Sequence, residues 1–152
     1  MAAEAAIRAG AGLTTVMCPE NAVPVLQTLV PNAMAVSADR KDIPAHDVLA
    51  LGCGLSQADG VWENILRVYD PAVRSVWDAD ALNLIAADRK LMSLVNVRHI
   101  LTPHPGEAKR LLPDLPSDDP CAAARQLAAL GATVLYKGAA CVCAAFTGFC
   151  AV

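Results

Sequence analysis

The sequence predicts an α/β fold with three layers, in which helices cover both faces of a mostly parallel central sheet. Short apolar runs alternate along the chain with segments of helical periodicity. A turn rich in Gly, Pro or Asp follows most of these runs, as is typical of strand ends in βαβ units. The length of 152 residues suits one domain, residues 1–152.

Each predicted strand is a short apolar run that ends at a turn. In chain order the strands are Leu13–Met17, Val48–Leu51, Ser75–Trp77, His99–Leu101, Thr133–Tyr136, Cys141–Ala144 and Phe149–Val152. We expect the last two to pair with each other across a turn at Thr147-Gly148.

The predicted helices carry apolar residues three and four positions apart. They are Ala2–Ala9, Asn21–Leu29, Ala58–Tyr69, Ala81–Ala87, Glu107–Leu112 and Cys121–Leu130. Asp80 is a suitable N-cap for the fourth of them, because its carboxylate can accept from the first free N–H groups. A loop with three prolines precedes the last helix.

Composition excludes several classes of protein. Hydrophobic residues make up 55% of the chain and charged residues 18%, which indicates a globular protein. The net charge of −3 and the lack of long basic runs argue against nucleic acid and membrane surfaces as partners. No apolar run approaches the roughly 20 residues that cross a bilayer. Glu4 and Arg8 interrupt any signal-peptide core, so a cytoplasmic location is expected.

The six cysteines do not have the spacing of a metal site or a disulfide framework. They are Cys18, Cys53, Cys121, Cys141, Cys143 and Cys150. The close pair Cys141 and Cys143 would share one face of a strand, so we expect both to be small core residues.

Polar turns follow four of the predicted strands, at the positions where ligands bind in open parallel sheets. Gly52-Cys53-Gly54 is either a tight turn or a stretch of bare backbone that a ligand can approach. Asp78 and Asp80 act either as helix caps or, beside a phosphate, as ligands of Mg²⁺ or its waters.

Two further turns carry candidate binding residues. In "LTPHPGE" the prolines fix φ and Gly106 is expected to allow an unusual turn, so the loop is rigidly aimed. Glu107 either stabilises a helix N-terminus or accepts hydrogen bonds from a polar ligand. Lys137, before Gly138, either places an ammonium beside a phosphate or protects a sheet edge. Neither GxxxxGK[ST] nor GxGxxG is present.

Taken in order, these segments resemble one family. The blocks are "AAIRAGAGLTTV", "DVLALGCGLSQ", "SVWDADALNLIA", "LTPHPGEAKRLL" and "TVLYKGAACVCA". They resemble the ADP-dependent NAD(P)H-hydrate dehydratases, a branch of the ribokinase-like superfamily, from Ala2 to Val152. The resemblance implies a ribokinase-like fold and a lyase of metabolite repair, which removes water from the S epimer of hydrated NADH or NADPH (NADHX or NADPHX).

The same resemblance implies ligands and roles. ADP or ATP, with Mg²⁺, would supply the phosphoryl group that turns the hydroxyl into a leaving group, and the enzyme would be a homotetramer. Substrate-binding residues would be Gly54, His104, Pro105, Gly106, Glu107, Ala108, Lys109 and Arg110. Nucleotide-binding residues would be Lys137, Gly138, Ala139, Ala140 and Cys141.

The sequence also departs from the family pattern. The family usually reads GPGLG where this chain has Cys53 and Ser56 in place of a proline and a glycine. Family members begin earlier and continue past Val152 into a glycine-rich stretch that ends in Gly-Asp and supplies the catalytic aspartate. We therefore expect a sheet incomplete at both termini, no catalytic residue in this chain, and no activity from the chain alone. The alternatives are a ribokinase-like kinase acting on a vitamin precursor and a non-catalytic nucleotide-binding remnant.

Overall fold

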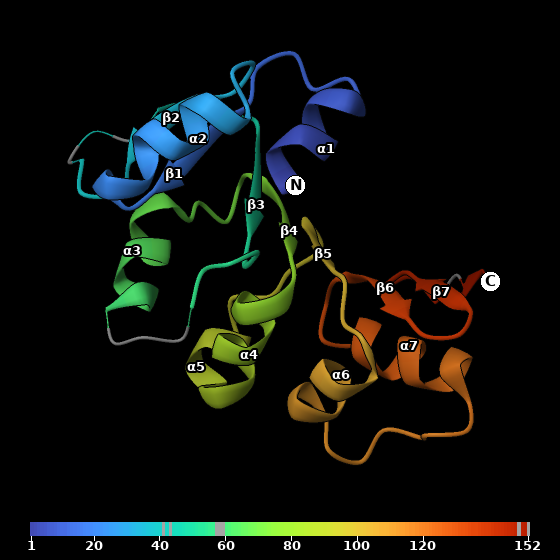
Figure 1. Cartoon of the computed structure of the whole chain (residues 1–152). Helices are drawn as coiled ribbons and strands as arrows, with labels where there is room; N and C mark the ends of the chain where they lie inside the picture. The colour runs from blue at the N-terminus through green and yellow to red at the C-terminus, as the bar shows by residue number, and fades with distance from the viewer. Residues whose placement is uncertain (41, 43, 57–59, 149, 152) are drawn as a thin grey trace. The chain divides into compact units, whose positions relative to one another are not determined.

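The computed structural model divides the chain into two units, Met1–Ala45 and His46–Val152, and each is described by itself (Figure 1). The residues described are 1–40, 42, 44–56, 60–148, 150 and 151. A single domain over residues 1–152 stays a prediction.

The first unit pairs two short parallel strands. Its elements are helix α1 (Ala2–Arg8), strand β1 (Thr15–Cys18), the 3-10 helix η1 (Glu20–Ala22), helix α2 (Val23–Leu29) and strand β2 (Met34–Ser37). The predicted helix from Asn21 is divided into η1, which begins at Glu20, and α2, which begins at Val23. Pro24 lies in the first turn of α2, where a missing N–H costs nothing. Strand β2 was not predicted; it pairs in parallel with β1 from Thr15↔Met34 onward.

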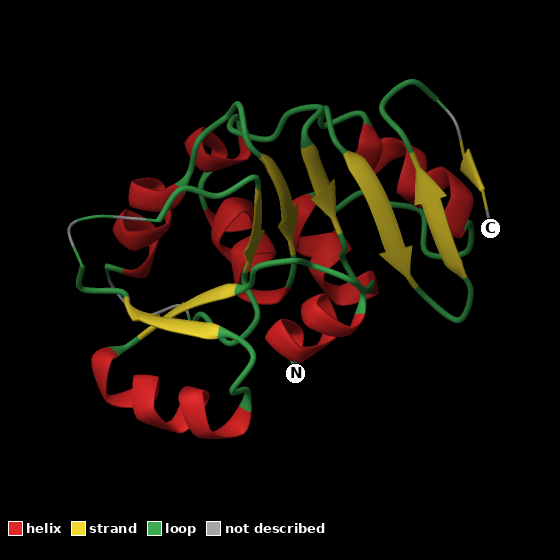
Figure 2. Cartoon of the chain, turned by 90° about the horizontal axis from the view of Figure 1, so that it is seen from above, coloured by secondary structure: helices red, strands yellow, loops and turns green. Residues whose placement is uncertain are grey.

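The second unit contains a six-stranded sheet in the order β3-β4-β5-β6-β7-β8 (Figure 2). The strands are β3 (Val48–Leu51), β4 (Arg74–Trp77), β5 (His99–Leu101), β6 (Thr133–Lys137), β7 (Cys141–Ala144) and β8 (Cys150–Ala151). The first four are parallel, and β7 and β8 continue antiparallel. The mostly parallel sheet is confirmed, and so is the pairing of the last two strands for Cys150 and Ala151. Phe149 and Val152, the ends of the predicted last strand, lie outside the described residues.

The helices of this unit are α3 (Val61–Val68), α4 (Ala79–Ala87), α5 (Arg89–Met92), α6 (Pro105–Leu111) and α7 (Pro120–Ala128). Each parallel connection advances one strand in the same direction, so right-handed crossovers place the helices on one face. Figure 1 shows α4 to α7 on one side of the strands. The short helix α5 was not predicted. The helix predicted over Ala58–Tyr69 corresponds to α3, which begins at Val61; residues 58 and 59 of that prediction lie outside the described part.

The two faces of this sheet differ in burial. Trp77, Leu101 and Val134 are fully buried on the helix side. On the other face Val48 is 59% exposed and Ile100 41% exposed within the described residues. Helices over that second face therefore remain a prediction. Among the described residues no helix has the length and apolar character needed to cross a membrane.

A buried aromatic cluster joins β4 and β5 on the helix side. The His99 ring stacks on Trp77 with centroids 5.1 Å apart, and Tyr69 meets both rings edge-on. The Trp77 indole N–H donates to Ser75 Oγ at 2.6 Å, and the Asn96 N–H donates to His99 Nδ1 at 3.2 Å. Burial lowers the pKa of His99, so its ring is neutral in the folded protein near neutral pH.

Candidate functional site

The carboxyl ends of β3, β4, β5 and β6 lie at one edge of the sheet, because these four strands are parallel neighbours. Backbone hydrogen bonds extend the pairing past the strand ends: Asp78 N–H to Leu51 O (3.0 Å), Thr102 N–H to Trp77 O (3.1 Å) and Lys137 N–H to Pro103 O (2.8 Å). The turns after these strands therefore stay in register. Gly54, His104 and Gly106 follow strand ends at this edge, and that they line one crevice stays a prediction.

The two glycines of the first turn have different roles. Gly52 has φ +112°, and a Cβ built on it would lie 1.7 Å from the Asp78 carbonyl oxygen. Its lack of a side chain thus serves close packing of the protein's own backbone. Gly54 has φ +72°, and apart from its chain neighbours no atom of the described residues lies within 4 Å of the position of a Cβ there. Of the two, Gly54 offers bare backbone with open space in front of it.

The N-cap of α4 is Asp78, and the prediction of Asp80 as the cap is wrong. Asp78 Oδ1 accepts a hydrogen bond from Ala79 N–H at 2.9 Å, and the helix begins at Ala79. Asp80 lies in the first turn, where its Oδ2 accepts from the Ser56 N–H at 2.9 Å. Ala79 has φ +49°, a left-handed conformation that is uncommon for a residue with a side chain.

Asp78 also forms an ion pair with Lys137, with Oδ1 and Nζ 2.6 Å apart. Strand β5 lies between the strands that carry them, so the pair crosses over the end of β5. Lys137 is therefore not an edge lysine. Partial burial by itself raises the pKa of the Asp78 carboxyl, but hydrogen bonds from Lys137 and the Ala79 N–H and the charge of Lys137 outweigh it. The pKa lies below its ordinary value, so Asp78 is ionised at neutral pH.

Helix α6 begins at Pro105, two residues earlier than predicted. His104 is its N-cap: His104 Nδ1 accepts from the N–H groups of Gly106 (3.0 Å) and Glu107 (3.4 Å). Glu107 Oε2 accepts from the His104 N–H at 2.9 Å, which completes a capping box. Gly106 lies inside the helix without a positive φ, so its predicted turn role is wrong. A Cβ there would lie 2.8 Å from His104 Cε1, so Gly106 makes room for the capping ring.

The remaining residues of this segment separate into buried and exposed ones. Glu107 is 5% exposed and Ala108 is 1% exposed, so Glu107 serves the capping box and the Ala108 side chain packs in the core. The side chains that a ligand can reach belong to His104, Pro105, Lys109 and Arg110.

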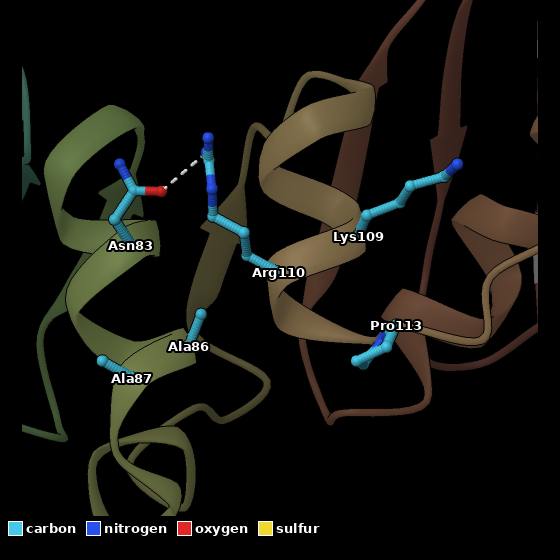
Figure 3. A pocket seen from close by; sticks show the side chains of 6 residues that line it. All are labelled: Asn83, Ala86, Ala87, Lys109, Arg110 and Pro113. Carbon is cyan, nitrogen blue, oxygen red and sulfur yellow. Dashed lines mark hydrogen bonds between the residues drawn. The ribbon is translucent and has the colours of Figure 1, made fainter.

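A cavity of about 580 Å³ lies between α4 and α6, and it brings Lys109 and Arg110 together (Figure 3). It is lined by Asn83, Ala86, Ala87, Lys109, Arg110 and Pro113. Arg110 Nη1 donates to Asn83 Oδ1 at 3.0 Å across the cavity, while Lys109 points away from that pair. Asn83 is a polar residue that the sequence did not indicate. Gly54, His104 and Gly106 do not line this cavity.

The predicted nucleotide-binding residues form the turn between β6 and β7 at the same carboxyl edge. Lys137 and Cys141 are paired residues of the hairpin, and the Gly138 N–H donates to the Ala140 carbonyl at 3.2 Å. Gly138, Ala139, Ala140 and Cys141 are exposed. The structure thus presents this segment to solvent beside the Asp78–Lys137 ion pair.

The cysteines with described side chains are free thiols: Cys18, Cys53, Cys121, Cys141 and Cys143. Cys141 is exposed, so its predicted place in the core is wrong, and Cys143 is half-buried. The side chain of Cys150 lies outside the described part. Within that part no group of three or more His, Cys, Asp or Glu side chains is placed to hold a metal ion.

The parallel sheet with polar turns at its carboxyl edge defines an open α/β protein of a class that binds ligands at that edge, and similarity to solved structures shows the ribokinase-like fold. Solved structures support this class. A ribokinase-like superfamily protein from Enterococcus faecalis superposes with a TM-score of 0.79 at 27% identity, over 97% of this chain and 55% of that one. The ADP/ATP-dependent NAD(P)H-hydrate dehydratase from Bacillus subtilis, co-crystallised with ATP/Mg²⁺, gives 0.77 at 26% identity, over 98% and 57%.

Sequence comparison gives the family. The model of the NAD(P)H-hydrate dehydratase family matches residues 1–151. The bifunctional NAD(P)H-hydrate repair enzyme Nnr of Escherichia coli is 36% identical over 95% of this chain, and the corresponding enzyme of Leishmania infantum is 41% identical over 91%. The chain belongs to the NAD(P)H-hydrate dehydratase family. It spans 29% and 30% of the length of these two relatives.

Proposed function

We propose that this chain carries the substrate- and nucleotide-binding edge of an ADP-dependent NAD(P)H-hydrate dehydratase, a hydro-lyase of nicotinamide nucleotide repair. One observation carries the proposal: the segments assigned to the two ligands lie at the same edge of the sheet. The substrate would meet Gly54 and His104–Arg110, and the nucleotide would meet Lys137–Cys141.

In the proposed reaction ADP or ATP donates its terminal phosphoryl group to the hydroxyl oxygen of the hydrated nicotinamide ring. Loss of phosphate from one ring carbon and of a proton from its neighbour then restores the double bond. The products are NADH or NADPH, inorganic phosphate, and the nucleotide shortened by one phosphate. Lys137 would offset charge on the phosphates through its remaining N–H donors.

We assign no catalytic base among the described residues. Three carboxylates at the carboxyl edge are already engaged by the protein. Asp78 pairs with Lys137, Asp80 accepts from Ser56, and Glu107 accepts from His104. A general base needs a free position within hydrogen-bond reach of the proton it removes.

Mg²⁺ fits this edge of the sheet only when it binds together with the phosphates of the nucleotide. The ion keeps several waters and takes one or two carboxylates together with phosphate oxygens. The described residues contain no cluster of three potential ligands, and the nearby carboxylates have partners. We therefore assign no resident Mg²⁺ site and no step to it. We further propose that the enzyme is a homotetramer and that it is located in the cytoplasm.

Binding of the two ligands tests the proposal, because residues 1–152 alone are predicted not to turn the hydrate over. Titration calorimetry should detect ADP with Mg²⁺ and, separately, hydrated NADH. Lys137→Met should weaken the binding of ADP by about ten-fold or more, as expected for loss of a charged hydrogen-bond donor. His104→Ala should weaken the binding of hydrated NADH more than the binding of ADP. Lys90→Met on α5 is the matched control and should change neither affinity.

Two outcomes would count against the proposal, and a third against the statement that no catalytic base is assigned among the described residues. Binding of neither ligand rejects the proposal for this chain. Phosphorylation of another small molecule, with no affinity for the hydrate, favours the kinase alternative. Recovery of NADH absorbance by residues 1–152 alone would place the base among them and overturn the assignment above.

A further inference from the structure

The geometry points to a two-armed brace: Asp78 positions the lysine on the nucleotide side, and Asp80 positions the glycine loop on the substrate side. We call Asp78-Ala79-Asp80 the DAD brace. The inference deepens the proposed function and rests on it for the identity of the two ligands. It assigns both aspartates as positioning residues.

The first arm reaches from β4 to β6. Asp78 Oδ1 lies 2.6 Å from Lys137 Nζ, and the same oxygen accepts from the Ala79 N–H. The Asp78 backbone is fixed as well, since its N–H donates to Leu51 O and its carbonyl packs against Gly52. A lysine side chain has four rotatable bonds, so a rigid carboxylate beside its ammonium removes most of its freedom.

The second arm reaches in the opposite direction along the edge, toward the turn after β3. Asp80 Oδ2 accepts from the Ser56 N–H at 2.9 Å. Ser56 has φ +72°, and the Leu55 N–H donates to Gly52 O at 3.3 Å. The carboxylate therefore holds the turn that contains Gly54 in a conformation that Ser56 does not favour by itself.

Ala79 separates the two arms. Its left-handed φ of +49° is costly for alanine and persists only where the surroundings determine it. Here the surroundings are the Gly52 contact before it and helix α4 after it. Because β3 and β6 lie on opposite sides of β4 in the sheet, the two carboxylates serve opposite sides of the edge. Because both carboxylates already have partners within the protein, this geometry argues against the alternative that Asp78 and Asp80 bind a metal ion as an acidic pair.

Two substitutions separate the arms. Asp78→Asn removes the ion pair but retains a side chain that caps helices well. Asp80→Ala removes the acceptor of the Ser56 N–H. Asp88→Asn, at the N-cap of α5, is the matched control because it changes an aspartate cap away from this edge. Each variant of the chain is titrated with Mg²⁺-ADP and with hydrated NADH, and amide hydrogen exchange is measured without ligand.

The brace predicts a crossover. Asp78→Asn should weaken the binding of ADP by about ten-fold and change the affinity for the hydrate by less than about two-fold. Asp80→Ala should weaken the binding of the hydrate by about ten-fold and change the affinity for ADP by less than about two-fold. The Ser56 amide should exchange roughly ten-fold faster in Asp80→Ala only. Equal weakening of both ligands by both variants, or no weakening, overturns the inference. If the wild-type chain binds neither ligand, the proposed function fails, and the exchange rate of Ser56 alone decides whether the brace stands.

Discussion

Replacing Gly52 by alanine should destabilise the fold far more than the same change at Gly54. At Gly52 the new Cβ would lie 1.7 Å from the Asp78 carbonyl oxygen and 2.9 Å from Ala81 N. An ordinary contact is about 3.5 Å, so the two backbones must separate by more than about 1.5 Å. At Gly54 the described part of the chain places no atom within 4 Å of the added carbon, apart from the chain neighbours.

The loss at Gly52 has three sources. A positive φ costs about 1–3 kcal/mol for alanine, the forced rearrangement about 1–3 kcal/mol, and the Leu51–Asp78 hydrogen bond about 1 kcal/mol. We expect a total of about 3–7 kcal/mol, a large share of the ~5–15 kcal/mol by which typical domains are stable. Gly54→Ala should cost only about 1–2 kcal/mol, from its left-handed φ.

Urea unfolding of both variants, extrapolated to water, measures these losses. A Gly52→Ala chain that fails to fold while Gly54→Ala folds also agrees with the reasoning. Losses that agree within about 1 kcal/mol would refute it, because the close contact at Gly52 would then carry no energetic weight.

Three further predictions concern stability and reactivity. Burial lowers the pKa of His99 in the folded protein. Near the ordinary histidine pKa of about 6.5 the unfolded chain therefore binds more protons than the folded one. The free energy of unfolding should accordingly fall as pH is lowered from ~7.5 to ~5.5. His99→Gln should flatten that slope in urea titrations, and an unchanged slope would contradict the assignment. Ser56→Gly should raise the free energy of unfolding by up to about 1 kcal/mol, because glycine adopts φ +72° without strain; a loss of stability would count against the strain. Exposed Cys53 and Cys141 should react with a disulfide reagent before Cys18, because burial and then Glu20 raise the pKa of the Cys18 thiol; mass spectrometry of the labelled peptides would show the opposite order if this is wrong.

Strand positions were predictable where an apolar run ends at a turn. The bounds of β3, β5 and β7 agree with the prediction to the residue. Strand β2 was missed because Met34–Ser37 contains alanine and serine, which do not favour strands, and forms through pairing with β1. Such pairing depends on residues distant in the sequence.

The details of the site depended on contacts that no local pattern contains. Asp78 and Asp80 both satisfy the rule for an N-cap, and the choice is made by Gly52 and by Lys137, which lies 59 residues further on. For α6 a local signal existed: Pro105 at the first helical position and Glu107 three residues after the cap. A histidine in place of serine or threonine at the cap concealed it.

Chemical-shift mapping of the ¹⁵N-labelled chain tests the central claim most directly, that one edge of the sheet receives both ligands. Hydrated NADH should produce its largest amide shifts in Gly54 and His104–Arg110. Mg²⁺-ADP added next should produce its largest shifts in Lys137–Cys141, at the same edge. Shifts concentrated at the opposite ends of the strands, around Arg74 and His99, would contradict the account.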